Sequence, residues 1–250
     1  MKRTSASILL GLIEPFKKPV ANLTVKNHWA MSFKLQGLIT DQVAPVQMTK
    51  GLIKLDSIVR RFNADMVTAS VSLNSYVSIV KKLDRAVEFS LTNPSALASD
   101  LSKDLTSEIF GSLELCQALL EAKNFYQEVD EEEVKNCGVL IEELIELLSN
   151  SGIEDITKKT IIRRVKDLKE ALNSFQIFGD TDVFKEAYFY QAYKESLDSL
   201  LIDPTLINRF QDLYGRIFKT SKPVSDAITI GRNLYLTYEA GRTVIERITQ

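Results

Sequence analysis

The sequence predicts an all-α protein, a helical bundle with one long heptad-patterned helix and an irregular N-terminal arm. The first observation is a seven-residue apolar repeat between Met48 and Val87, in which apolar side chains recur at alternating steps of three and four residues. The second is the scarcity of turn formers, because 10 Gly and 6 Pro in 250 residues are too few for an all-β chain. The third is a series of shorter apolar stripes after residue 95, each spaced like one face of a helix.

Residues 1–47 are predicted to form the irregular arm, because three prolines and two glycines interrupt them. We expect a short helix near Ser5–Ile13, followed by mostly extended chain. His28 and Trp29 are the only residues of their types in the protein. Because no second His, Cys or carboxylate stands at a useful spacing, we interpret them as a buried anchor of the arm rather than a metal or catalytic site.

The long helix is predicted over residues 48–92 and ends where Asn93 precedes Pro94, since the residue before a proline avoids the helical region. At a rise of ~1.5 Å per residue it would be about 65 Å long. Residues 67–74 keep an alternative open, because they alternate strictly between apolar and polar, which is the pattern of a strand. Their Ser, Thr and Val residues also favour helices poorly, so a broken helix is the second alternative.

Residues 95–250 are predicted to form a bundle of shorter helices that packs on the long helix. The arm, the long helix and the bundle are predicted to form one cooperative domain. Gly179 is an expected left-handed helix end, and Asp203 followed by Pro204 is an expected helix start. The turn at Gly152 predicts an antiparallel hairpin with Glu143 near Lys159 and the 144–148 stripe against 156–165. The predicted helices cover approximately 94–105, 107–129, 134–148, 153–178, 181–201, 204–217 and 224–248.

The heptad seam is expected to be covered by this chain rather than by a second copy. A parallel dimer would carry complementary charges beside the seam, but few charges stand there and all of them are negative. Ile58, Val77, Ile79 and Ala86 instead widen the apolar stripe, and a wide stripe needs neighbours on two sides. We expect these neighbours to come from the later helices, including the aromatic region 175–193.

The charge pattern is nearly balanced overall but uneven along the chain. The net charge is −2, whereas residues 1–94 carry +7, residues 95–155 carry −12 and residues 156–250 carry +3. A protein with this total has no strong field that attracts DNA or acidic membranes. Two cysteines in a chain of this length make no disulfide framework, which favours the reducing cytoplasm. No apolar run reaches the length that spans a bilayer, so we expect a soluble protein.

Two groups of residues are candidate binding sites. Aromatic side chains concentrate between residues 175 and 193, where three are consecutive and cannot all face one core. This region is the candidate partner-binding site, with Phe184, Tyr188, Phe189, Tyr190 and Tyr193. The second group comprises two basic pairs separated by three heptads, about 31 Å along a continuous helix. That spacing is close to one turn of DNA, ~34 Å, so these are the candidate phosphate or nucleic-acid contacts: Arg60, Arg61, Lys81 and Lys82.

Catalytic, metal and cofactor sites are not expected. The sequence has no Gly-rich phosphate loop, HExxH or CxxC motif, and Glu142, Glu143 and Glu146 lack the matching His of a bundle metal site. The acidic run 130–133 is interpreted as a helix N-terminus. We therefore predict a non-catalytic, cytoplasmic helical protein–protein interaction module of the scaffold, adaptor, inhibitor or immunity type. The alternatives are a membrane-acting, pore-forming-like helical protein, with residues 66–80 as the released segment, and a nucleic-acid-binding accessory protein.

Overall fold

The computed structural model describes residues 1–18, 22–35, 45–71, 73–101, 104–180, 182–187, 201 and 203–220. The chain divides into two compact units. The N-terminal unit comprises residues 2–126, and the C-terminal unit comprises residue 1 together with residues 127–250. The sequence predicts one cooperative domain made of three parts, residues 1–47, 48–92 and 95–250. None of the bounds between these parts coincides with the division after residue 126. The predicted helix over 224–248 lies outside the described residues.

The predicted irregular arm is wrong, because its described residues are largely helical and buried. Helix α1 spans Ser5–Ile13, as the sequence predicted, and the 3-10 helix η1 spans Glu14–Lys17. Helix α2 then spans Val25–Ser32. Thr24 caps α2 by accepting a hydrogen bond from the Asn27 backbone N–H at 3.3 Å. A Thr cap at the start of α2 was the local signal for a helix in this region.

Trp29 is the centre of an aromatic cluster in the N-terminal unit and is fully buried, as expected. Its ring lies 4.6 Å from the ring of Phe16 and 5.5 Å from that of Phe33, measured between centroids. Its indole N–H donates to the Ser90 hydroxyl at 2.7 Å. The cluster therefore joins α2 to helix α4, which spans Leu73–Thr92, and satisfies the polar atom of the buried indole.

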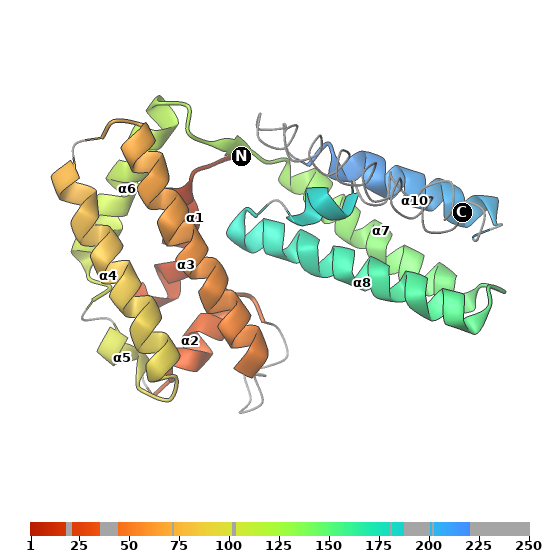
Figure 1. Cartoon of the computed structure of the whole chain (residues 1–250), viewed down its shortest axis with the longest axis horizontal. Helices are drawn as coiled ribbons and strands as arrows, with labels where there is room; N and C mark the ends of the chain where they lie inside the picture. The colour runs from red at the N-terminus through yellow and green to blue at the C-terminus, as the bar shows by residue number, and fades with distance from the viewer. Residues whose placement is uncertain are drawn as a thin grey trace, which may run out of the picture. The chain divides into compact units, whose positions relative to one another are not determined.

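The single long helix over 48–92 is wrong, because two helices replace it. Helix α3 spans Pro45–Thr68 and α4 begins at Leu73 (Figure 1). Ser70 has a φ of 54°, and the Val71 N–H donates to the Met66 carbonyl at 3.2 Å, which is the closing bond of a Schellman motif. The Ser, Thr and Val residues of this stretch have low helix propensity, so a break there costs little stability and the chain reverses direction. The break was one of the two alternatives to a continuous helix.

Helices α3 and α4 pack against each other as an antiparallel pair. Phe62 faces Tyr76 across the pair, and Asp56 and Arg60 of α3 lie close enough to Asp84 of α4 to influence its pKa. The heptad seam is largely buried within this chain, as expected, but the two helices cover each other, together with α1 and residues 107–122. Its buried members are Met48, Leu52, Leu55, Val59, Phe62, Met66, Ala69, Tyr76, Leu83 and Val87, widened by Ile58, Ile79 and Ala86. Packing of the region 175–193 on the seam stays a prediction.

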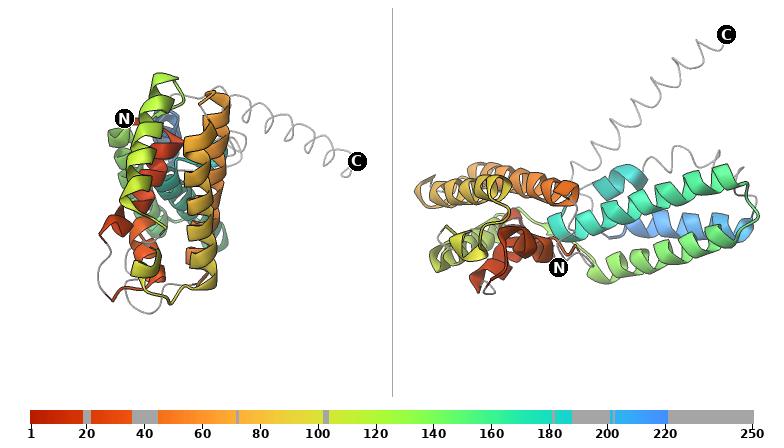
Figure 2. Two further views of the ribbon diagram at one scale, coloured as in Figure 1. Left: turned by 90° about the vertical axis from the view of Figure 1, so that its left-hand side faces the viewer. Right: turned by 90° about the horizontal axis from the view of Figure 1, so that it is seen from below.

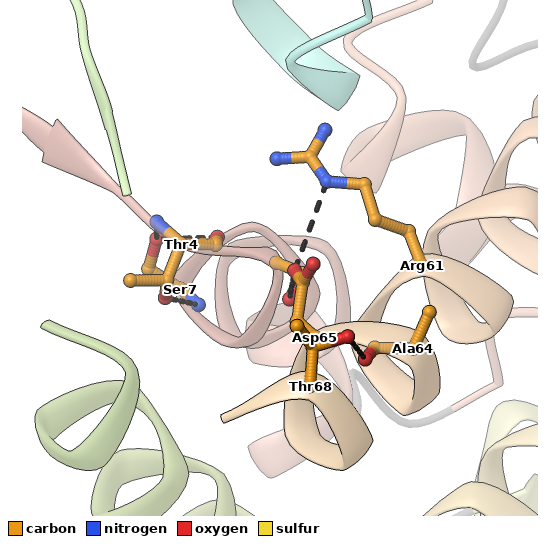
Figure 3. Close-up of polar contacts among 7 residues, drawn as sticks. Thr4, Ser7, Arg61, Ala64, Asp65 and Thr68 are labelled. Atoms are coloured by element: carbon orange, nitrogen blue, oxygen red, sulfur yellow. Dashed lines mark hydrogen bonds and ion pairs between the residues drawn. The ribbon is translucent and has the colours of Figure 1, made fainter. Parts of the chain in front are cut away.

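The N-terminus of α1 is fixed to α3 by a group of polar contacts (Figure 3). Thr4 and Ser7 form a reciprocal capping box, with N–H to hydroxyl distances of 2.9 and 3.0 Å. The hydroxyl of Ser5, which is buried, donates to the Asp65 carboxylate at 2.6 Å. Asp65 in turn lies 3.9 Å from Arg61. The hydrogen bond from Ser5 to Asp65 holds α1 against α3.

Two further helices complete the described part of the N-terminal unit. Helix α5 spans Ala98–Leu101, and its first residue donates a backbone hydrogen bond to Leu23 at 3.0 Å. Helix α6 spans Ser107–Ala122 and packs against α1, α3 and α4. The two-residue strands β1, Lys2–Arg3, and β2, Gln127–Glu128, are the described strands. The all-α class with very little strand is therefore confirmed.

The described part of the C-terminal unit contains three long helices (Figure 2). Helix α7 spans Glu131–Asn150 and packs against α8, Asp155–Phe178, and α10, Pro204–Ile217. The predicted helix signals are confirmed. Gly179 ends α8 with a φ of 62°, and Asp203 caps α10 by accepting from the Thr205 N–H at 2.8 Å. Asp130 caps α7 by accepting from the Glu133 N–H at 3.1 Å, so the acidic run is a helix N-terminus.

The α7–α8 hairpin is confirmed, but its predicted register is wrong. Leu144, Leu148, Ile161 and Val165 share one buried cluster, as expected, whereas Ile156 is 74% exposed. The ion pair across the hairpin joins Glu142 to Lys169, and Glu143 lies 3.3 Å from Arg209 of α10 rather than near Lys159. Residues 151–154 form a wider connection than a two-residue turn, which carries Lys159 toward the end of the hairpin.

Candidate interaction surface

Helix α6 has an inner face that builds the core of the N-terminal unit. Its N-cap residue is Thr106, and the chain leaves it at Lys123 before Asn124 adopts a left-handed φ of 62°. The inner side chains recur at helical spacing and are at most 3% exposed: Ile109, Phe110, Leu113, Cys116 and Leu120. This face contacts α1 and α4, so burying it accounts for the position of the helix.

The opposite side of α6 is also apolar, and it faces solvent. Leu115 is 61% exposed and Leu119 is 36% exposed. Between and beside them stand small residues that are exposed as well: Gly111, Ala118 and Ala122. At ~100° per residue these five positions cover roughly 100° of the helix circumference, diametrically opposite the inner face. We call them the outer face of α6.

Acidic side chains border the outer face. Glu114 and Glu121 stand on one side of it, and Glu121 accepts a hydrogen bond from the Gln117 amide at 2.9 Å. Glu108 stands at the start of the face, one turn before Gly111 and in line with Leu115, where it lies 3.5 Å from Lys82 of α4 while its side chain stays 80% exposed. Lys123 follows the end of the helix and is exposed. The face therefore has two carboxylates along one side, a carboxylate paired with Lys82 at its start and the Lys123 ammonium group at its end.

The sequence carries a signal for this outer face that the predicted apolar stripe of the helix does not include. Residues 107–122 are apolar at positions on both sides of the helix, whereas a helix on a protein surface is ordinarily apolar on one. The inner stripe is sufficient to predict a helix that packs on a core. The second stripe, at Leu115 and Leu119, is not needed for that prediction. An apolar face of this kind on a folded unit marks a binding surface more often than isolated exposed leucines do.

The four basic candidates do not lie along one helix, because the break at 69–72 separates them. Arg60 is 78% exposed and pairs with Asp56 at 2.8 Å, and Arg61 lies beside Asp65. Lys82 lies beside Glu108, and Lys81 is exposed. The separation of about 31 Å assumed a continuous helix, so that argument no longer applies. Their role in binding phosphate or nucleic acid stays a prediction.

A carboxylate of α4 lies next to this basic group. Burial raises the pKa of Asp84, the nearby Asp56 carboxylate raises it further, and Arg60 opposes both effects. The Arg60 guanidinium is held mainly by its hydrogen bond to Asp56. The local field around Arg60 is thus already compensated by two carboxylates, which reduces what it offers to a phosphate.

The aromatic candidates are described only in part. Phe184 is 8% exposed and meets Phe175 edge-on, with ring centroids 5.3 Å apart. It belongs to the buried cluster of the C-terminal unit. Tyr188, Phe189, Tyr190 and Tyr193 lie outside the described residues. Binding of a partner through this region therefore stays a prediction, and for Phe184 the described contact is a core contact.

The two cysteines and the histidine lie in the cores. Burial raises the pKa of the Cys116 thiol, and burial together with Glu133 raises that of Cys137 to about 12. Burial lowers the pKa of His28, which packs 5.1 Å from the Phe16 ring. Among the described ranges, no cluster of His, Cys, Asp and Glu has the arrangement that holds a metal ion. No described helix is long and apolar enough to cross a membrane.

Comparisons with known proteins add no relative to this description. No protein-family model, no curated protein and no solved structure matches the chain.

Proposed function

We propose that this protein is a non-catalytic helical protein–protein interaction module, and that the outer face of α6 is its contact surface. The observation that carries the proposal is the 61% exposure of Leu115 in the middle of a helix whose other side is buried. Exposed apolar surface that is contiguous and rimmed by polar groups is typical of a binding site. Covering such a face removes apolar area from water, at roughly 25 cal/mol per Å².

The chemistry of the cores supports the absence of catalysis in this proposal. The thiols of Cys116 and Cys137 are buried, and a raised pKa keeps both protonated and unreactive at neutral pH. The one imidazole, that of His28, is buried among aromatic rings. The two cysteines are free thiols, which supports a reducing cytoplasm as the location. Scaffold, adaptor, inhibitor and immunity proteins all fit this description.

The test is affinity capture with the full-length protein as bait in a lysate of its source cells. We expect Leu115→Gln to lose at least one captured protein that the wild type retains, because a polar side chain replaces the central apolar contact. Leu91→Gln is the matched control, since Leu91 is an exposed leucine of α4, 48% exposed, outside the outer face. Each captured protein is then purified, and its affinity for the three baits is measured.

The proposal fails if Leu115→Gln and Leu91→Gln bind every purified partner as tightly as the wild type does. Circular dichroism of both variants is the accompanying control. An unchanged spectrum shows that any loss of binding comes from the surface, because neither leucine contributes to a core.

A further inference from the structure

We propose that the occupant of the outer face of α6 is an amphipathic helix of another protein, with an apolar stripe flanked by lysine and arginine side chains. The inference rests on the proposed function and adds the chemistry of the partner to it. Three features of the described residues carry it: the length of the face, the alternation of large and small residues on it, and the sign of the charges along its border.

The length and relief of the face fit a helix. From Gly111 to Ala122 the face extends about 16 Å, or three turns. Leu115 and Leu119 project from it, while Gly111, Ala118 and Ala122 leave shallow positions between them. The space beyond Gly111 is open, because a Cβ placed there would have no heavy atom within 4 Å. A partner helix can therefore place its own large side chains over the small residues and approach closely.

The border of the face determines the charge of the partner. Glu114 and Glu121 line one side of the face, whereas Glu108 at its start is paired with Lys82 and Lys123 follows its end. A partner with an acidic flank on that side would be repelled by both carboxylates. One with Lys or Arg on that flank forms pairs with them, which fixes its register and speeds its association. The occupant therefore has a basic flank.

A second copy of this chain fits the same face less well. In an antiparallel pair related by a two-fold axis, each residue of one copy meets its counterpart in reverse order. The pairing that sets Leu115 over Ala118 of the other copy also brings Glu114 close to Glu121 of that copy, twice per dimer. Like charges at such positions oppose association, so the acidic border disfavours the self-pairing that the apolar stripe alone would allow.

The experiment compares two synthetic peptides by fluorescence anisotropy against the full-length protein. Both have roughly 18 residues, about five helical turns, and the same leucine stripe. The first has lysine flanks and the second has glutamate flanks. We expect the lysine peptide to bind at least about tenfold more tightly than the glutamate peptide. Leu115→Gln should weaken the lysine peptide by about tenfold as well, whereas Leu91→Gln should leave its affinity unchanged.

A charge reversal tests the border separately from the stripe. In the double variant Glu114→Lys/Glu121→Lys, both exchanged side chains lie beside the outer face and outside the core. We expect this variant to lose its preference for the lysine peptide and to bind the glutamate peptide more tightly than the wild type does. The proposal is overturned if the wild type binds both peptides equally, or if Leu115→Gln binds the lysine peptide like the wild type.

Sedimentation of the wild type and of Leu115→Gln checks the competing occupant. A wild-type dimer that this substitution converts to a monomer would show that the face takes a second copy, which overturns the proposal. Its failure remains distinguishable from failure of the proposed function. If the peptides show no preference but Leu115→Gln still loses a purified partner, the function stands and the partner chemistry is wrong. If partner binding is unchanged as well, both fail.

Discussion

The ring of Phe62 on α3 meets the ring of Tyr76 on α4 edge-on, with centroids 6.5 Å apart and planes at 84°. Both residues are fully buried, and they stand on either side of the break that turns the heptad seam back on itself. The edge-to-face arrangement is the one that aromatic pairs prefer. The pair therefore locks the antiparallel helices together at the end next to their connection.

Replacing Phe62 by alanine should destabilise the N-terminal unit. The expected loss in the free energy of unfolding is about 3–5 kcal/mol, because the substitution leaves a cavity in a closed core. Urea unfolding followed by fluorescence measures it, since the one tryptophan, Trp29, is buried in this unit. A variant with unchanged stability that converts a dimer to a monomer would instead place the seam at a partner surface.

A glycine on α3 is required by the ring that packs over it. A Cβ at Gly51 would clash with Cδ2 of Phe33, whose ring is buried and stacked on Trp29. Gly51→Ala should therefore destabilise the unit by about 1–3 kcal/mol through overpacking. Gly11→Ala is the matched control, because Gly11 is helical and nothing lies within 4 Å of its added Cβ. It should stabilise the unit by roughly 0.5–1 kcal/mol.

The same tryptophan signal reports both substitutions, so their opposite signs are read from one set of unfolding curves. Equal effects of Gly51→Ala and Gly11→Ala would show that the Phe33 ring does not cover α3 at this point. A stabilised Gly51→Ala variant would lead to the same conclusion.

The buried imidazole makes the stability of the N-terminal unit depend on pH. Burial lowers the pKa of His28 below its ordinary 6.5, and a hydrogen bond with the Thr24 backbone opposes the effect. The unfolded chain therefore binds a proton more readily than the folded one. This contribution to stability is fully present above about pH 6.5 and is lost as the pH falls below it.

Because His28 is the only histidine, a single variant isolates its titration. Between pH 7.5 and 5.5, the unfolding free energy of the wild type should fall relative to that of His28→Leu, with a slope of up to about 1.4 kcal/mol per pH unit. Parallel pH profiles of the two proteins would show that the folded and unfolded pKa values are equal.

Much of the fold follows from sequence signals that act locally. Gly179 and Asp203 end and start helices as predicted, because a left-handed glycine and a capping carboxylate act on their own turn of backbone. The seam positions are buried as predicted, because apolar spacing determines which face of each helix is covered. These signals do not depend on what the rest of the chain does.

The break at Ser70 shows why the long helix could not be predicted. The heptad continues across the break without a change of phase, since both helices turn the same seam toward each other. A periodic pattern records which face is buried, and it is the same for one straight helix and for two that pack together. The weak helix formers at 67–72 were the local signal, but tertiary packing decides between the two arrangements.

The outer face of α6 could not be recognised from the sequence for a related reason. Leu113 continues the stripe of Ile109, Cys116 and Leu120, so spacing alone assigns it to the core, whereas nothing local says whether Leu115, which is off that stripe, is covered by another element. The position of α6 against α1 and α4 buries Leu113 and leaves Leu115 exposed. Whether Leu115 is covered is decided by packing, so the candidate surface emerges only with the tertiary structure.

The account depends on the two sides of α6 having different roles, and a comparison on this one helix tests that directly. The measurement is the unfolding free energy of Leu113→Ala and Leu115→Ala from urea curves followed by Trp29 fluorescence. Leu113 is fully buried, so its loss should cost about 2–5 kcal/mol. Leu115→Ala should stay within ~0.5 kcal/mol of the wild type. Equal, large losses would contradict the account, because Leu115 would then be part of the folded core and not a surface for a partner.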